Sequence, residues 1–299
     1  MSDDSFIFPK LSNHEDYVET WYPVIEDLTF KTWIFNFSYD EGIFLRKIAL
    51  QTIKNEELTE SDQNTFDEFL SKVSTFFENV KKESPPNSGY FLRLGSRSLK
   101  DAVLAGEKSL SRLTDFLYNK YSEEYKNLKL NSKEEKIAWV NQKSQMNDLF
   151  YITECDIKAL KCYTISEMFE LFFRSERIIT DLKTGITKEI PNFTLNFRLW
   201  DDRLTYQMEF RGFVYHHKFC ALTQYDERIY YSKVYENKEK ILSAIQNLYE
   251  NKVRPKMQSN CVMPEGTYVI DFGVIFNSPD DIEALVIEIN PFSKEAGSS

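Results

Sequence analysis

Two short apolar segments near the C-terminus, each interrupted by polar residues, constrain the fold of this chain most. Residues 269–274 read Val-Ile-Asp-Phe-Gly-Val, and residues 286–292 read Val-Ile-Glu-Ile-Asn-Pro-Phe. Short apolar runs rich in β-branched residues predict buried β-strands. Side chains two residues apart on a strand point to the same face, so Glu288 and Asn290 present their oxygens side by side. Asp271, on a neighbouring strand, is placed to join them.

These three side chains form a candidate metal site. Carboxylate and amide oxygens are the ligands that Mg²⁺ prefers, together with water and substrate phosphate. The alternative is that Asp271, Glu288 and Asn290 lie on an ordinary solvent-facing sheet surface. The spacing of the three residues leaves both interpretations open.

A second candidate site is basic. Arg93 and Arg97 flank a Gly-Ser turn after a predicted strand, and Lys100 follows at the start of a predicted helix. Arginine side chains and helix N-termini both bind phosphate well. A surface cluster of cations without a ligand explains the same pattern, so this motif alone does not decide between the two.

Three further segments carry cations next to apolar or aromatic residues: residues 172–175, 198–200 and 209–211. The first ends an apolar run with Arg174 and Ser175. In the last, Glu209 and Arg211 share one strand face, where a structural ion pair between them is weak evidence for function.

The bulk composition excludes several classes of protein. The 299 residues are 42% hydrophobic and 28% charged, a composition that is typical of a soluble globular protein. The net charge of -10 argues against bulk binding to nucleic acid. The four cysteines and three histidines complete no metal-ligand pattern, and a cytosolic protein with reduced thiols is expected. Neither a signal peptide nor a membrane span is predicted. P-loop and Rossmann fingerprints are absent.

The hydrophobic pattern predicts both helices and strands. Residues 84–89 (Ser-Pro-Pro-Asn-Ser-Gly) break the chain and suggest an N-terminal lobe over residues 1–84 and a core over 87–299. Strands are predicted over residues 29–37, 90–94, 159–163, 195–200, 206–215, 219–225, 268–276 and 284–289, and helices over 61–82, 109–128, 133–148 and 238–250. Ser61 is the expected N-cap of the first helix, and residues 44–52 are ambiguous between strand and helix.

Several of these segments, taken in order, resemble blocks of the cell division cycle protein 123 family, a branch of the ATP-grasp superfamily. The similarity begins at Trp-Tyr-Pro (21–23) and ends at Ile-Glu-Ile-Asn-Pro-Phe (287–292), where the family has Ile-Asp-Phe-Asn-Pro-Phe. Intermediate blocks lie at residues 90–94, 100–102, 160–162, 171–175, 197–200, 208–213 and 222–224. Each block is short, but together they follow the family's order over nearly the whole chain.

The resemblance implies an α+β protein with an ATP-grasp fold, in which two lobes with mainly antiparallel sheets grip ATP. It carries Asp271, Glu288 and Asn290 over as Mg²⁺ ligands. Two family lysines that face phosphate are replaced here by Arg93 and Arg174, which keeps the charge but turns a point contact into a planar fork. The implied nucleotide-binding residues are Arg93, Lys100, Arg174, Ser175, Arg198, Trp200, Glu209 and Arg211.

The resemblance also implies a function in the cytoplasm. Members of the family act as assembly chaperones for eukaryotic translation initiation factor 2 and bind its gamma subunit, so ATP and that subunit are the expected partners. One alternative is an ATP-grasp enzyme, a ligase or a phosphoryl or nucleotidyl transferase, in which the same arginines stabilise transferring charge. Another is a decayed ATP-grasp module that only binds proteins, but retention of all three oxygen ligands speaks against it.

Overall fold

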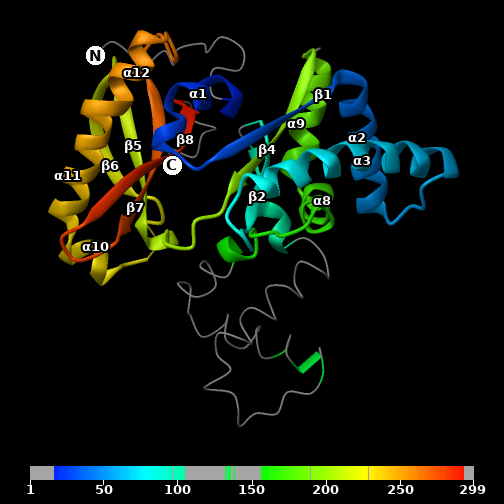
Figure 1. The fold of residues 1–299 in the computed structure, drawn as a ribbon, viewed down its shortest axis with the longest axis horizontal. Coiled ribbons are helices and arrows are strands. Elements are labelled where there is room, and N and C mark those ends of the chain that lie inside the picture. Colours follow the sequence, from blue (N-terminus) through cyan, green and yellow to red (C-terminus); the bar gives the residue numbers. More distant parts are fainter. Residues whose placement is uncertain are drawn as a thin grey trace, which may run out of the picture. The chain divides into compact units, whose positions relative to one another are not determined.

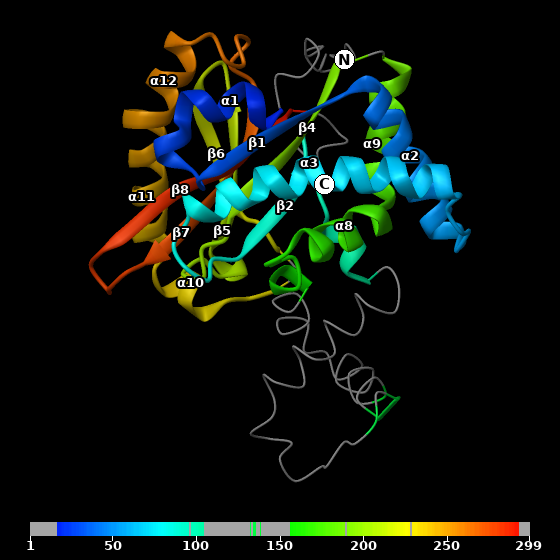
Figure 2. The same cartoon turned by 45° about the vertical axis from the view of Figure 1, so that its right-hand side comes forward.

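The structure is a computed structural model that describes residues 17–95, 97–104, 132, 134–135, 138, 156–188, 190–227 and 229–292. The described chain forms two compact units (Figures 1 and 2). Unit 1 combines Met1–Thr32 with Asp201–Ser299, and unit 2 is Trp33–Trp200. The helices predicted over residues 109–128 and 133–148 lie almost wholly outside the described residues. No helix within the described ranges is long and apolar enough to cross a membrane.

Unit 2 is built on a four-stranded sheet in the order β1-β4-β2-β3, with β2 antiparallel to both β4 and β3. Its elements are β1 (Thr32–Ser38), α2 (Tyr39–Lys54), α3 (Glu60–Lys82), β2 (Tyr90–Leu94), β3 (Arg97–Ser98), the 3₁₀ helix η2 (Lys100–Leu104), α8 (Ile165–Arg174), α9 (Glu176–Thr187) and β4 (Asn192–Leu199).

The core of unit 2 is aromatic. Helix α3 packs on the sheet through Phe77, whose ring lies 5.0 Å from the ring of Tyr90 and 5.6 Å from that of Phe197. Phe37 on β1 stacks on Phe193 of β4 at 5.4 Å. Because β1 and α3 share one core with β2 and β4, residues before and after the predicted break at 84–89 belong to the same unit.

The compact units therefore differ from the predicted division into residues 1–84 and 87–299. The break itself is real, since the chain turns between α3 and β2 there. The physical reason for the difference is that local turn chemistry marks the end of an element, whereas the extent of a unit depends on which residues share a core.

Local signals in unit 2 explain its element boundaries. Residues 44–52, which the pattern left ambiguous, lie within α2, whose first residues form a capping box between Ser38 and Glu41. The expectation that Ser61 caps α3 was wrong: the N-cap is Thr59, whose Oγ1 accepts the backbone N–H of Asp62 at 3.1 Å.

The strand predicted over residues 159–163 was also wrong. This segment is a turn that meets β2 only through a bridge between Tyr90 and Cys162, with two backbone hydrogen bonds of 2.8 Å. A single bridged residue pair does not make a strand. Ala159 and Leu160 lie in the turn, and their apolar side chains are buried there.

Asp156, just before this turn, gives unit 2 an expected pH dependence. Burial raises the pKa of this carboxyl from 3.8 to about 6, and its Oδ1 is buried without a hydrogen-bond partner. A folded-state pKa above the unfolded value means that the folded protein binds the proton more tightly, so stability falls as the pH rises from about 4 to 6. We expect Asp156→Asn to raise the melting temperature at pH 7.5.

The measurement is a pair of thermal melts at pH 4 and pH 7.5. The gain from Asp156→Asn should be larger at pH 7.5 than at pH 4, because the carboxyl is mostly neutral at the lower pH. Asp280→Asn is the control, since the Asp280 side chain is 96% exposed. Equal gains from Asp156→Asn at both pH values would show that the charge of Asp156 does not weaken the fold.

Unit 1 is built on an antiparallel sheet in the order β6-β5-β7-β8, with helices on one face (Figure 1). Its elements are α1 (Val18–Ile25), the 3₁₀ helices η1 (Glu26–Leu28) and η3 (Tyr206–Met208), β5 (Glu209–Tyr215), β6 (Lys218–Gln224), α10 (Ser232–Glu236), α11 (Lys238–Leu248), the π-helix η4 (Tyr249–Val253), α12 (Arg254–Ser259), β7 (Tyr268–Phe276) and β8 (Ile282–Pro291).

The core of unit 1 lies between the sheet and its helices. Helix α11 buries Ile241, Ile245 and Leu248 on one face, as its sequence pattern predicted. Helix α1 adds Trp21, which is fully buried in the same core although it comes from the opposite end of the chain. The prediction of an α+β protein with mainly antiparallel sheets is confirmed.

Candidate functional site

The three predicted metal ligands lie on the sheet of unit 1, on the face opposite its helices. Asp271 on β7 stands directly opposite Glu288 on β8, and Arg211 on β5 stands opposite Asp271 from the other side. Directly opposed residues of antiparallel strands share a face. Their sequence neighbours Phe210, Ile270 and Phe272 belong to the core with the helices, so the polar row faces the other way.

A β-bulge brings the two carboxylates together. The register between β7 and β8 shifts between Asp271 and Phe272, so Phe272 pairs with Val286 while Asp271 pairs with Glu288. The extra residue in β8 is Ile287. If the strand had no bulge, the residue opposite Asp271 would be Ile287 and not Glu288. The bulge therefore sets the position of Glu288.

Arg211 and Asp271 form a two-point ion pair. Arg211 Nε donates to Asp271 Oδ1 at 2.8 Å, and Nη2 donates to Oδ2 at 2.9 Å. The Asp271 side chain is 1% exposed and the Arg211 side chain 13%. The guanidinium also lies 4.8 Å from the ring centre of Tyr225. Arg211 thus forms an ion pair across strands with Asp271, while Glu209 lies two residues away on its own strand.

Asn290 completes the group. Its Nδ2 donates to Asp271 Oδ2 at 3.3 Å and to Glu288 Oε1 at 3.1 Å. The amide therefore bridges the two carboxylates, and the four side chains of Arg211, Asp271, Glu288 and Asn290 form one continuous polar cluster, named here the carboxylate cluster.

Burial and the proximity of two carboxylates shift the pKa values in the carboxylate cluster. Burial raises the pKa of Asp271, the hydrogen bond from Arg211 lowers it, and the neighbouring Glu288 carboxylate raises it further, with a net shift upward. Burial lowers the pKa of Arg211, but its hydrogen bond to Asp271 and the charge of that carboxylate outweigh burial and raise it. Two carboxylates held this close attract a cation beyond the one that Arg211 supplies.

The donor set fits Mg²⁺ in its chemistry. Asp271 and Glu288 offer carboxylate oxygens on one face of the sheet, and Asn290 would add its amide oxygen after a rotation, since its Nδ2 faces both carboxylates here. In the part of the chain that the structure describes, no group of three or more His, Cys, Asp or Glu side chains is placed to hold a metal. An ion at Asp271, Glu288 and Asn290 would therefore be held by few protein ligands, as is usual where Mg²⁺ keeps waters and substrate phosphate.

Unit 2 carries a second polar row. On its sheet, Arg93 of β2 stands opposite Asn196 of β4, and Phe91 stands opposite Arg198. Arg93 is 5% exposed and Arg198 is fully buried, with its guanidinium 5.3 Å from the ring centre of Phe91. Alternation along β4 puts Thr194 on the same face as Asn196 and Arg198.

The sequence analysis missed Thr194 and Asn196. Asn196 is fully buried and donates from Nδ2 to the carbonyl oxygen of Gly95 at 2.8 Å, while its Oδ1 has no hydrogen-bond partner. Thr194 Oγ1 is also buried without a partner. The signal that points to them is a polar residue at every second position (194, 196 and 198) of an otherwise apolar strand.

Two predicted nucleotide-binding residues have a structural role in unit 2. Ser175 is the N-cap of α9, where its Oγ accepts the backbone N–H of Ile178 at 3.2 Å and donates to Asp101 Oδ1 at 2.7 Å. Trp200 packs edge-to-face on Phe91 at 6.0 Å. Arg97, singled out with Arg93 in the sequence, is engaged in an ion pair of 2.7 Å with Asp181.

The remaining predicted residues, Arg174, Lys100 and Glu209, are half-buried. Arg174 is the last residue of α8, Lys100 the first of η2, and Glu209 the first of β5, two residues before Arg211 on the same strand face. The structure thus brings together Arg211, Asp271, Glu288 and Asn290 in unit 1, and Arg93 and Arg198 in unit 2.

Comparison with known proteins agrees with this architecture. The sequence model of the D123 family matches residues 147–299. The structure of Cdc123 from Schizosaccharomyces pombe is similar with a TM-score of 0.59 and 17% sequence identity, covering 97% of this chain and 90% of that one. A C-terminally truncated Cdc123 from the same organism gives a TM-score of 0.56 and 18% identity, covering 95% and 86%.

At these identities the solved structures establish the fold, and the match of the family model over half of the chain establishes the family. The blocks that the sequence analysis quoted at residues 197–200, 208–213 and 287–292 lie inside the matched region and supply β4, β5 and β8 of the two sheets. The chain belongs to the D123 family.

Proposed function

We propose that this chain binds Mg-ATP and that the carboxylate cluster of unit 1 holds the metal. The observation that carries the proposal is the cross-strand alignment of Asp271 with Glu288, which gathers two carboxylates and the Asn290 amide on one sheet face. Bound Mg²⁺ would neutralise part of the charge of the triphosphate and hold its oxygens in place.

Each residue of the cluster has a distinct task in this proposal. Asp271 and Glu288 supply the negative charge, and Asn290 adds an uncharged oxygen. Burial and the Glu288 carboxylate raise the pKa of Asp271 on balance, and the two-point pair with Arg211 opposes this shift, as a bound metal ion also would.

Mg-ATP is expected to raise the melting temperature. A ligand at 100 times its Kd stabilises the folded state by about 2.7 kcal/mol, which corresponds to a rise of several degrees. Glu288→Gln removes one ligand charge from a half-buried position, and Asn290→Ala removes the amide oxygen, so both variants should lose most of the rise. The measurement is a thermal melt with and without saturating Mg-ATP.

Glu283→Gln is the matched control. Glu283 lies on the same strand, β8, but its exposed side chain pairs with Arg203 outside the carboxylate cluster. The control should keep the full rise. If saturating Mg-ATP does not change the melting temperature of the unmodified protein, the nucleotide proposal is overturned.

We further propose that the chain uses this nucleotide as an assembly factor for eukaryotic translation initiation factor 2. Membership in the D123 family supports this role. We expect the recombinant gamma subunit to co-purify with the protein in Mg-ATP, and labelled ATP to remain intact during the incubation. Steady release of ADP or AMP, or transfer of label to a macromolecule, would instead indicate an ATP-grasp enzyme.

A further inference from the structure

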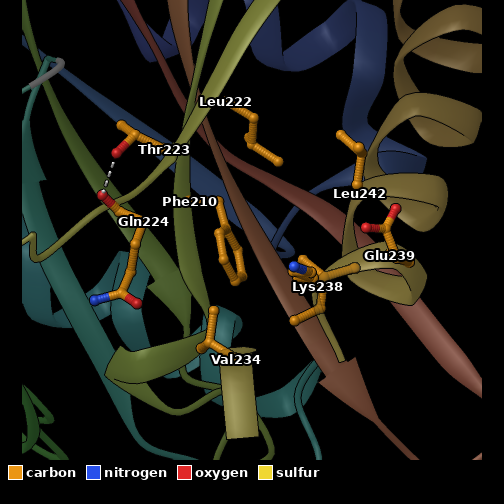
Figure 3. Close-up of a pocket in the computed structure, with 9 residues that line it drawn as sticks. Phe210, Leu222, Thr223, Gln224, Val234, Lys238, Glu239 and Leu242 are labelled. Atoms are coloured by element: carbon orange, nitrogen blue, oxygen red, sulfur yellow. Dashed lines mark hydrogen bonds between the residues drawn. The ribbon is translucent and has the colours of Figure 1, made fainter. Parts of the chain in front are cut away.

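The two edges of the unit 1 sheet have different neighbours. Beside β6, a pocket of about 240 Å³ is lined by Phe210 of β5, Leu222 of β6 and Val234 of α10 (Figure 3). Beside β8, the chain segment between η1 and β1 forms a parallel bridge in which Thr29 pairs with Val286. An edge strand presents backbone groups that the sheet does not pair, and this segment covers part of the β8 edge.

Thr29 donates a side-chain hydrogen bond to the β8 edge. Its Oγ1 lies 2.6 Å from the carbonyl oxygen of Val286. Thr29 is half-buried and Val286 is fully buried, so water competes little for this bond. The two residues are 257 positions apart in the sequence, so the contact arises from tertiary packing and not from a local turn.

The accepting residue lies next to the β-bulge of β8. Val286 pairs with β7 just before the register shifts, Ile287 is the extra residue, and Glu288 follows it opposite Asp271. A bulge disrupts the ladder locally, so the backbone there receives fewer restraints from its partner strand. The bond from Thr29 supplies a restraint from the other side of β8, two residues before Glu288.

The core of unit 1 holds Thr29 in place. Leu28, the residue before it, is buried in the same core as Trp21 of α1. After it, the backbone N–H of Thr32 donates to the hydroxyl oxygen of Tyr22 at 3.0 Å and ties that end of the segment to α1 as well. The hydroxyl group that reaches β8 is therefore anchored at both ends of its segment.

We propose that Thr29 is a positioning residue of the metal site. By holding the carbonyl oxygen of Val286, it fixes the bulge and so the place of the Glu288 carboxylate beside Asp271. This inference rests on the proposed function, because the role of Thr29 is defined toward the metal of bound Mg-ATP. Groups that orient metal ligands without touching the metal typically contribute about 10–100-fold to metal affinity.

The choice of metal separates positioning from general stability. Mg²⁺ demands nearly ideal octahedral geometry with short bonds, whereas Ca²⁺ accepts longer bonds and irregular geometry. A displaced Glu288 carboxylate should therefore weaken the binding of Mg-ATP more than that of Ca-ATP. A general loss of stability would weaken both to the same degree, so the ratio of the two affinities measures the positioning.

The test compares two substitutions of Thr29. Thr29→Val keeps the shape of the side chain and removes the hydroxyl donor, while Thr29→Ser keeps the donor. Titration calorimetry of ATP into the full chain should show that Thr29→Val binds Mg-ATP about tenfold more weakly than the unmodified protein does. Its affinity for Ca-ATP should change by less than about twofold. Thr29→Ser should restore most of the affinity for Mg-ATP.

Thr32→Val is the matched control. The Thr32 hydroxyl group donates to the carbonyl oxygen of Phe30 at 2.8 Å, a bond within the same segment that does not reach β8. This variant should keep the affinity for Mg-ATP. A second readout needs no nucleotide: hydrogen exchange at the amides of Ile287 and Glu288 should speed up in Thr29→Val and stay unchanged in Thr32→Val.

The failure of this inference differs from the failure of the proposed function. If the unmodified protein does not bind Mg-ATP, the proposed function is overturned, and the role of Thr29 with it. If the unmodified protein binds Mg-ATP and Thr29→Val binds it equally well, only the role of Thr29 is overturned. An equal loss of affinity for Mg-ATP and Ca-ATP, or unchanged exchange at Ile287 and Glu288, would also contradict positioning by Thr29.

Discussion

A fragment consisting of residues 87–299 is expected to show no cooperative thermal unfolding transition. The cut removes Val18, Trp21 and Ile25, all fully buried in the core of unit 1. It also removes β1 and α3 from unit 2, including Phe77, which packs between Tyr90 and Phe197. Each core would lose elements that pack against its sheet, so neither sheet could bury its apolar face completely.

Calorimetry and circular dichroism of the fragment and of the full chain measure this outcome. A matched pair of single substitutions tests the same reasoning on the full chain. Trp21→Ala should lower the free energy of unfolding by about 3–5 kcal/mol, while Tyr230→Ala, at a largely exposed position, should change it by less than about 0.5 kcal/mol. A sharp melting transition of the fragment near that of the full chain would contradict the shared cores.

Asp271→Ala is expected to destabilise the protein by about 3–5 kcal/mol, even without nucleotide. The substitution leaves the Arg211 guanidinium in a site where its side chain is only 13% exposed, without the carboxylate that accepts two of its N–H groups. Loss of this two-point pair is costly because water cannot fully replace the carboxylate at a largely buried position. Urea denaturation, followed by fluorescence, gives the change in the free energy of unfolding.

Two comparisons isolate the buried pair. Glu283→Ala removes the carboxylate from an exposed pair with Arg203, so its cost should stay below about 1 kcal/mol. The double variant Arg211→Met with Asp271→Leu should be more stable than Asp271→Ala, because it removes both charges of the buried pair instead of one. A cost for Asp271→Ala no larger than that for Glu283→Ala would show that burial does not strengthen the pair.

Much of the fold was predictable because its strands carry local signals. β7 over Tyr268–Phe276 follows the predicted limits, and the β-branched and aromatic residues of β2, β4, β5, β6 and β8 predicted strands close to those observed. The partnership of α1 with the C-terminal sheet was not predictable in this way. Trp21 and Ile289 are far apart in the sequence, and their shared core arises from packing, which periodicity does not encode.

The candidate site was predictable in its residues but not in its geometry. Two-residue spacing correctly put Glu288 and Asn290 on one strand face. Their alignment with Asp271 depends on the bulge at Ile287, and no glycine or other turn residue in this segment predicts that bulge. Ser175, which the family blocks placed among the nucleotide-binding residues, is also the N-cap of α9, a role that the sequence analysis did not predict.

Direct titration of ATP into the full chain tests the central claim, that the carboxylate cluster holds the metal of bound Mg-ATP. Isothermal titration calorimetry with and without Mg²⁺ separates metal-dependent from metal-independent binding. We predict saturable binding that needs Mg²⁺, is lost in Glu288→Gln and is kept in Glu283→Gln. Binding that is equally tight without Mg²⁺, or unchanged in Glu288→Gln, would contradict the claim.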